Sequence, residues 1–81
     1  MMSKYTPLNT YLRSISLAQR DITLTFNQVE QIIRDRLPTS AFKHGAWWSN
    51  ANSHVEALAW MDAGWRVDSF SLKQKWVRFI R

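Results

Sequence analysis

The segment Trp65–Ile80 reads WRVDSFSLKQKWVRFI and decides the fold, because it predicts two strands at the end of the chain. Side chains in residues 65–70 alternate in character, which is the pattern of a strand with one buried face. Residues 76–80, WVRFI, are mainly of the aromatic and β-branched types that favour strands. The polar residues 71–75 predict a turn or a longer loop, so the segment is expected to form a β-hairpin.

A helix is predicted immediately before this hairpin, from about Ser53 to Ala63. Ser53 and Glu56 have the spacing of a capping box, and Gly64 fits the position just beyond the last turn. Glu56 and Asp62 are the only charged residues of this helix. Because carboxylates are repelled by phosphates, we place the predicted contact surface on the preceding segment, on the first turn of the helix and on the hairpin.

The amino-terminal part of the chain predicts a helix followed by a strand. Thr6 and Pro7 suit a helix start, because a hydroxyl can cap it and proline tolerates its first turn. Apolar residues at helical spacing extend this helix to about Ser16 or Leu17. Residues 22–26, ITLTF, alternate at period two and predict a short strand.

A second helix is expected directly after that strand. Thr25 and Gln28 match a capping box, and Pro38 is expected to end the helix. The stripe predicted to face the core is Val29, Ile32, Ile33 and Leu37.

The predicted order is helix, strand, helix, an optional helix at residues 39–45, helix, strand and strand. This order predicts the α+β class: a small three-helix domain with a three-stranded antiparallel sheet, similar to a winged helix-turn-helix. The gap formed by residues 38–52 is longer than the roughly three or four residues of a helix-turn-helix connection. Either residues 39–45 are an inserted helix, or the chain forms another small α+β unit.

The stretch Ala46–Trp65 carries four of the five tryptophans, so it is either core or contact surface. If Trp47 and Trp48 lie in extended chain, their rings point to opposite sides. One of them is then expected in the core and the other exposed or half-exposed, and the sequence leaves open which. Trp65 and Trp76 are predicted to be core residues, and Trp60 is undecided.

The chain has 81 residues, no cysteine and a formal net charge of +5, and it is expected to form one domain, residues 1–81. The lack of cysteine excludes disulfides and thiolate metal sites and agrees with a cytoplasmic location. The positive charge favours a polyanionic partner, with DNA preferred to RNA, and a homodimer if the target is a palindrome. No stretch has the length of a membrane span and no secretory signal is recognisable, so no membrane association is expected.

Several short motifs run through the middle of the chain: LPTSA at residues 37–41, WWSN at 47–50, His54, and AWMDAGW at 59–65. Together they resemble a family of small, largely uncharacterised bacterial and phage proteins with LPxSA, WWxN and AWxxAGW motifs. The resemblance covers roughly residues 5–70. It implies a prokaryotic or phage origin and a compact stand-alone domain, and it assigns no catalytic residue.

The residue content argues against catalysis. His44 and His54 are the only histidines, and neither a metal-binding spacing nor a phosphate-binding glycine loop is present. A His-Asn-His nuclease reading of His44, Asn50 or Asn52, and His54 lacks the expected strand-strand-helix context. We therefore predict no enzyme activity, no cofactor and no metal.

The leading hypothesis is a DNA-binding module, acting as a transcriptional regulator or accessory factor. Basic residues of the hairpin would hold phosphates, and the segment 43–54 would supply specificity through amides, histidines and a stacking tryptophan. The predicted contacts are Lys43, His44, Trp48, Asn50, Asn52, His54, Arg66, Lys73, Lys75 and Arg78.

Two alternatives remain open. The first is a phage- or plasmid-encoded protein that inhibits a host factor through an exposed tryptophan patch. The second is a reader of modified or unpaired bases, in which a tryptophan stacks on the base.

Overall fold

The computed structural model describes residues 3–81 and divides them into helices and strands close to the predicted order. The elements are α1 (Thr6–Arg13), β1 (Asp21–Thr25), α2 (Phe26–Ile33), α3 (Thr39–Lys43), the 3-10 turn η1 (Gly45–Trp48), α4 (Val55–Met61), β2 (Arg66–Ser71) and β3 (Trp76–Ile80). The α+β class is confirmed. The optional helix forms as α3, so the described chain has four α-helices and not three.

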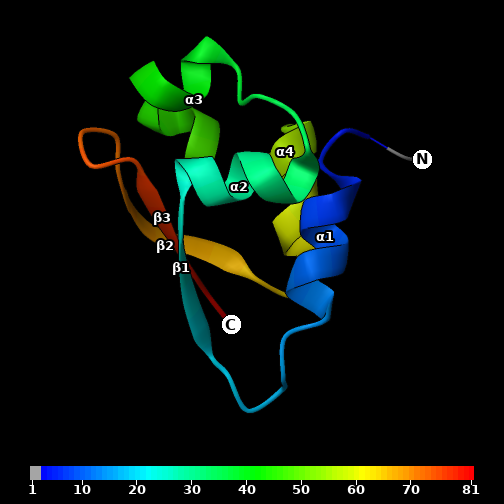
Figure 1. Cartoon of the computed structure of the whole chain (residues 1–81). Helices are drawn as coiled ribbons and strands as arrows, with labels where there is room; N and C mark the ends of the chain where they lie inside the picture. The colour runs from blue at the N-terminus through cyan, green and yellow to red at the C-terminus, as the bar shows by residue number, and fades with distance from the viewer. Residues whose placement is uncertain (1–2) are drawn as a thin grey trace.

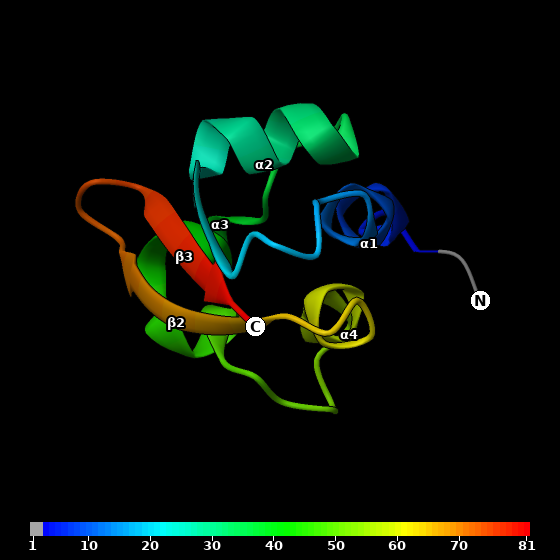
Figure 2. The same ribbon diagram turned by 90° about the horizontal axis from the view of Figure 1, so that it is seen from below.

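The three strands form one antiparallel sheet in the order β1-β3-β2. The early strand therefore pairs with the last strand of the hairpin, as the predicted architecture requires. Val77 at the centre of β3 faces Leu24 on one side and Phe70 on the other. The helices α1, α2 and α4 gather on one side of the sheet, and α3 lies beside the end of the hairpin (Figure 1 and Figure 2).

The capping box at the start of α2 is confirmed. The Gln28 backbone N–H donates to the Thr25 hydroxyl at 3.0 Å, and the Thr25 N–H donates to the Gln28 side chain at 2.8 Å. This box turns the chain sharply from strand to helix, so the strand ends at Thr25 and Phe26 is already helical. The prediction that the strand includes Phe26 is wrong by that one residue.

The end of α2 differs from the prediction. The helix stops at Ile33 because Arg34 adopts a left-handed conformation with φ of 56°. Pro38 therefore does not end the helix. Leu37 is buried, as expected of a core residue, but it lies in the loop after the helix.

The first helix is shorter than predicted. It ends at Arg13, before Ser16, and residues 14–20 form turns and loop. The Arg81 guanidinium donates to the carbonyls of Ile15, Ser16 and Gln19 and lies 4.2 Å from the centre of the Trp65 ring.

The start of α4 is also a correction. The helix begins at Val55, and no side chain caps it, so the predicted box of Ser53 and Glu56 does not form. Glu56 turns inward instead and is buried. The helix ends at Met61, two residues before the predicted Ala63, whereas the predicted role of Gly64 is confirmed: Gly64 has φ of +86°, and the Trp65 N–H donates back to the Trp60 carbonyl at 2.9 Å.

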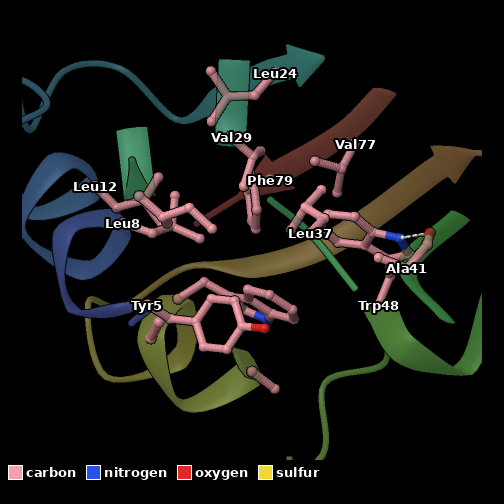
Figure 3. Packing of buried hydrophobic residues seen from close by; sticks show 14 of the residues in the cluster. Tyr5, Leu8, Leu12, Leu24, Val29, Leu37, Ala41, Trp48, Val77 and Phe79 are labelled. Carbon is pink, nitrogen blue, oxygen red and sulfur yellow. Dashed lines mark hydrogen bonds between the residues drawn. The ribbon is translucent and has the colours of Figure 1, made fainter. Parts of the chain in front are cut away.

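Three tryptophans fill the centre of the core. Trp48, Trp60 and Trp65 are all at most 2% exposed, which settles the undecided Trp60 as a core residue. Figure 3 shows apolar side chains of α1, α2 and β3 in the same core as Trp48. The prediction that Trp76 is a core residue is wrong. Its side chain is half-exposed, on the face of the sheet away from the core.

Candidate nucleic-acid interface

Trp48 cannot serve as a stacking residue for a base, which corrects that prediction. The segment Gly45–Trp48 is a 3-10 turn and not extended chain, and it directs the Trp48 ring into the core. The indole stacks on Phe26 at a ring distance of 4.8 Å, and its N–H donates to the Ala41 carbonyl at 2.9 Å (Figure 3). Every face of this ring is therefore used inside the protein.

Trp47 is half-exposed and Trp48 is buried, so the expectation of one core ring and one exposed or half-exposed ring is confirmed, although the segment is not extended. The Trp47 ring packs edge-on against Trp48 at 4.6 Å and against Tyr5 at 5.9 Å, and it is half-buried. Burial raises the pKa of the Tyr5 hydroxyl above its usual value, and the carboxylates of Glu56 and Asp35 raise it further. Within Gly45–Trp48, Trp47 is thus the one tryptophan that reaches the surface, as a single half-exposed ring.

Asn50 is a structural residue, which corrects its predicted role in base recognition. Its side-chain oxygen accepts from the Trp60 indole N–H at 2.9 Å and from the Val67 backbone N–H at 2.8 Å. Its amide nitrogen donates to the Val67 carbonyl at 3.0 Å. The side chain thus pairs with the edge of β2 as another strand would, and little of its hydrogen-bonding capacity is left for a base.

The remaining polar residues before α4 are only partly available. Asn52 is exposed in a turn, and His54 is half-buried. The His54 Nδ1 atom lies 3.4 Å from the Ser49 hydroxyl and 3.6 Å from the Glu56 carboxylate. Because both neighbours meet the same ring nitrogen, the three side chains do not form a proton relay through the imidazole.

Arg78 does not offer a free charge to phosphate, which corrects another predicted contact. It lies on the open face of the central strand and forms ion pairs with Asp68 at 2.6 Å and with Asp21 at 3.1 Å. The hydrogen bond to Asp68 has the largest effect in raising the pKa of the guanidinium, and the hydrogen bond to Asp21 raises it further. Asp21 belongs to β1 and not to the hairpin. Counting the charges of the hairpin alone could therefore not show that the Arg78 charge is neutralised.

Four predicted residues do come together, and we call them the basic tip: Lys43, His44, Lys73 and Lys75. All four are exposed. Lys43 and His44 end α3, whereas the two other lysines lie in the turn between β2 and β3. Figure 1 shows this turn beside the α3 end of the molecule.

Two contacts hold the halves of the basic tip together. The Lys75 ammonium lies 5.9 Å from the centre of the Phe42 ring, next to Lys43. On the neighbouring strand, Phe70 covers Gly45 so closely that a Cβ atom there would lie 2.8 Å from the Phe70 ring. Glycine therefore permits η1 to approach β2. Arg66, at the opposite end of that strand from the turn, is exposed but is not part of the tip.

The described residues offer no metal centre and no membrane anchor of the helical kind. Among residues 3–81, no group of three or more histidines and acids is placed to hold a metal ion. In the same range, every helix is too short or too polar to cross a bilayer.

Two surface features were not predicted from the sequence. One is Trp76 on the open face of the sheet. It was predicted to be a core residue because its neighbours in the sequence favour a strand, but that preference does not show which face of the strand is buried. The other is a groove between α1 and α4 beside exposed Val55 and Leu58. Nothing in the spacing of these two side chains distinguishes an exposed stripe from a buried one.

Comparison with known proteins gives a family and nothing more specific. A family model described as a domain of unknown function (DUF7662) matches residues 5–81. The chain therefore belongs to this family, in agreement with the resemblance to an uncharacterised family noted from its motifs. No curated protein and no solved structure matches the chain.

Proposed function

We propose that this member of a family of unknown function is a small DNA-binding module, a transcriptional regulator or an accessory factor, whose basic tip holds the phosphate backbone. The single observation that carries the proposal is the meeting of two basic segments through Lys75 and Phe42. Cations gathered on one surface, and not net charge alone, provide the electrostatic attraction for DNA.

The distribution of acids supports this proposal. No acidic residue occurs between Asp35 and Glu56, or after Asp68. Both segments of the basic tip therefore carry only positive charge. Among the described residues, its three lysines form no ion pair, so they remain available for phosphate oxygens.

The order of elements supports a winged arrangement, in which the hairpin turn is the wing. In such an arrangement α4 would approach the DNA, but its exposed positions are Val55, Leu58 and Asp62. Apolar and acidic side chains are poorly suited to a DNA groove. We therefore assign α4 no base contacts, and we keep Asn52 and His54 as the candidates for specificity.

The test measures duplex DNA affinity by fluorescence anisotropy between about 50 and 200 mM salt. Each lysine–phosphate contact contributes about 0.9 to the slope of log affinity against log salt. The double substitution Lys73→Gln with Lys75→Gln is expected to reduce this slope by about 2. The matched control, Arg20→Gln with Arg36→Gln, removes the same charge from exposed positions outside the tip and is expected to leave the slope unchanged. Absence of binding at low salt, or equal slopes for both double variants, would exclude the proposal.

A second candidate function is the inhibition of a host protein, and the groove between α1 and α4 favours it. The groove has a volume of about 450 Å³, and Val55 and Leu58 at its wall are 53% and 37% exposed. The Asn9 side chain donates to the Ala59 carbonyl at 2.9 Å, and Arg13 donates to the Asp62 carbonyl at 2.6 Å. These bonds hold the two helices in place, so the groove is formed before any partner arrives.

The two functions can be separated by affinity capture from nuclease-treated bacterial lysate. Under the second candidate, wild-type protein retains one stoichiometric partner, and Leu58→Glu releases it. Leu17→Glu introduces the same charge at a position that is 83% exposed and serves as the control. Equal capture by both variants would count against the groove.

A further inference from the structure

The open face of the sheet carries one aromatic side chain, at the hairpin end of its central strand. Val77 and Phe79 of β3 are buried under the helices, whereas Trp76, Arg78 and Ile80 alternate with them and point the other way. Figure 1 and Figure 2 place α1, α2 and α4 on the covered side. The Trp76 ring is therefore displayed on the central strand of a surface that these helices leave uncovered.

The cross-strand neighbours of Trp76 are small. Its cross-strand partners are Thr25 on β1 and Ser71 on β2, both much smaller than an indole. The indole N–H donates to the Gln74 side chain at 3.1 Å, which fixes the edge of the ring toward the hairpin turn. No other tryptophan is available in this way, since Trp48, Trp60 and Trp65 are buried and Trp47 is packed between Tyr5 and Trp48.

The charges around Trp76 favour a polyanion. The two carboxylates on this face, Asp21 and Asp68, are both paired with Arg78, two residues along the strand. The turn that adjoins Trp76 contributes exposed Lys73 and Lys75. A strand whose phosphates follow these lysines would bring its bases over the open face.

We infer that the open face binds single-stranded nucleic acid, with an unpaired base stacked on Trp76 and the flanking phosphates on Lys73 and Lys75. This inference rests on the proposed function, and it specifies the form of nucleic acid. Stacking on an aromatic side chain requires a base with an accessible face, which a single strand offers and an intact duplex does not. The lysines of the basic tip can bind the phosphates of both single-stranded and duplex nucleic acid, whereas Trp76 can stack only on an unpaired base.

The experiment compares binding of a short oligothymidylate, an oligouridylate and a duplex to wild-type protein, Trp76→Leu and Trp76→Phe. Trp76→Leu is expected to weaken single-strand binding by at least about fivefold and to leave duplex binding unchanged. Trp76→Phe retains an aromatic face and is expected to bind single strands within about threefold of wild type. Tyr11→Leu is the matched control, because Tyr11 is a partly exposed aromatic residue on α1, on the covered side of the sheet and outside the basic tip. The two oligonucleotides distinguish RNA from DNA as the source of the unpaired base.

A second readout uses the tryptophan itself. A base stacked on Trp76 quenches its fluorescence, so oligothymidylate is expected to quench wild-type protein and to leave the emission of Trp76→Phe unchanged. Equal single-strand affinity for wild type and Trp76→Leu, with duplex binding intact, would overturn this inference and leave the proposed function standing. Failure to bind any of the three oligonucleotides would overturn the proposed function as well.

Discussion

The tryptophan-rich segment Ala46–Trp65 and the hairpin that follows it are the two aromatic regions of this protein, and they use tryptophan in opposite ways. In the first region, indole N–H groups reach distant partners: Trp65 donates to the Leu12 carbonyl at 3.1 Å, and Trp60 to Asn50 at 2.9 Å. In the hairpin, Trp76 donates to Gln74, two residues away. A long-range partner fixes the ring inside the core, whereas a local partner leaves it at the surface.

The polar residues of the two regions differ in the same manner. The Asn50 side-chain amide is hydrogen-bonded to Val67 and Trp60. A residue of the type that can recognise a base is therefore part of the scaffold. Lys73 and Lys75 of the hairpin form no ion pair among the described residues. The many tryptophans and amides of the first region therefore belong to the core, whereas unpaired charge beside a half-exposed ring marks the candidate interface.

The largest expected effect tests the first region. Trp48→Ala removes a ring that is 1% exposed and leaves a cavity between Phe26 and Trp60. We expect a loss of about 3–5 kcal/mol in the free energy of unfolding. Urea unfolding followed by far-UV circular dichroism measures it, since this signal does not depend on tryptophan fluorescence. Leu17→Ala, at an exposed position, is expected to change stability by less than about 0.5 kcal/mol. Similar values for the two variants would mean that Trp48 is not in the core.

A smaller effect tests the connection between the regions. Asn50→Ala leaves the Trp60 indole N–H and the Val67 N–H without their acceptor, and we expect a cost of about 1–3 kcal/mol. Asn52→Ala makes the same chemical change at an exposed position and is expected to be nearly neutral. Thermal unfolding of both variants gives the difference. If Asn52 proved the costlier of the two, the structural role assigned to Asn50 would be wrong.

The smallest expected effect tests Gly64, which lies just before the hairpin. Gly64 has φ of +86°, and a Cβ atom there would meet nothing within 4 Å, so Gly64→Ala costs only backbone strain. We expect about 1 kcal/mol, and a smaller loss for Gly64→Asn because asparagine tolerates this conformation better. Chemical denaturation resolves the two variants. A neutral alanine would show that the left-handed turn is not needed to start the hairpin.

The features that could be read from the sequence are those formed by neighbouring residues. The Thr25 and Gln28 capping box, the left-handed Gly64 after α4 and the turn before Trp76 each depend on contacts within a few residues, and all three were predicted. The box of Ser53 and Glu56 has the same local pattern and still fails. Burial of the Glu56 side chain competes with its capping bond, and burial depends on the whole fold.

The sequence by itself determined the order of helices and strands, the α+β class and the basic character of the hairpin turn, because short-range patterns encode them. Only the tertiary structure decided which polar residues are available. Asn50 meets Val67 across 17 residues, and Arg78 meets Asp21 across 57. Such pairings arise when the sheet closes and the chain doubles back. A residue type shows what a side chain can bind, but the folded neighbours decide whether that capacity is already used.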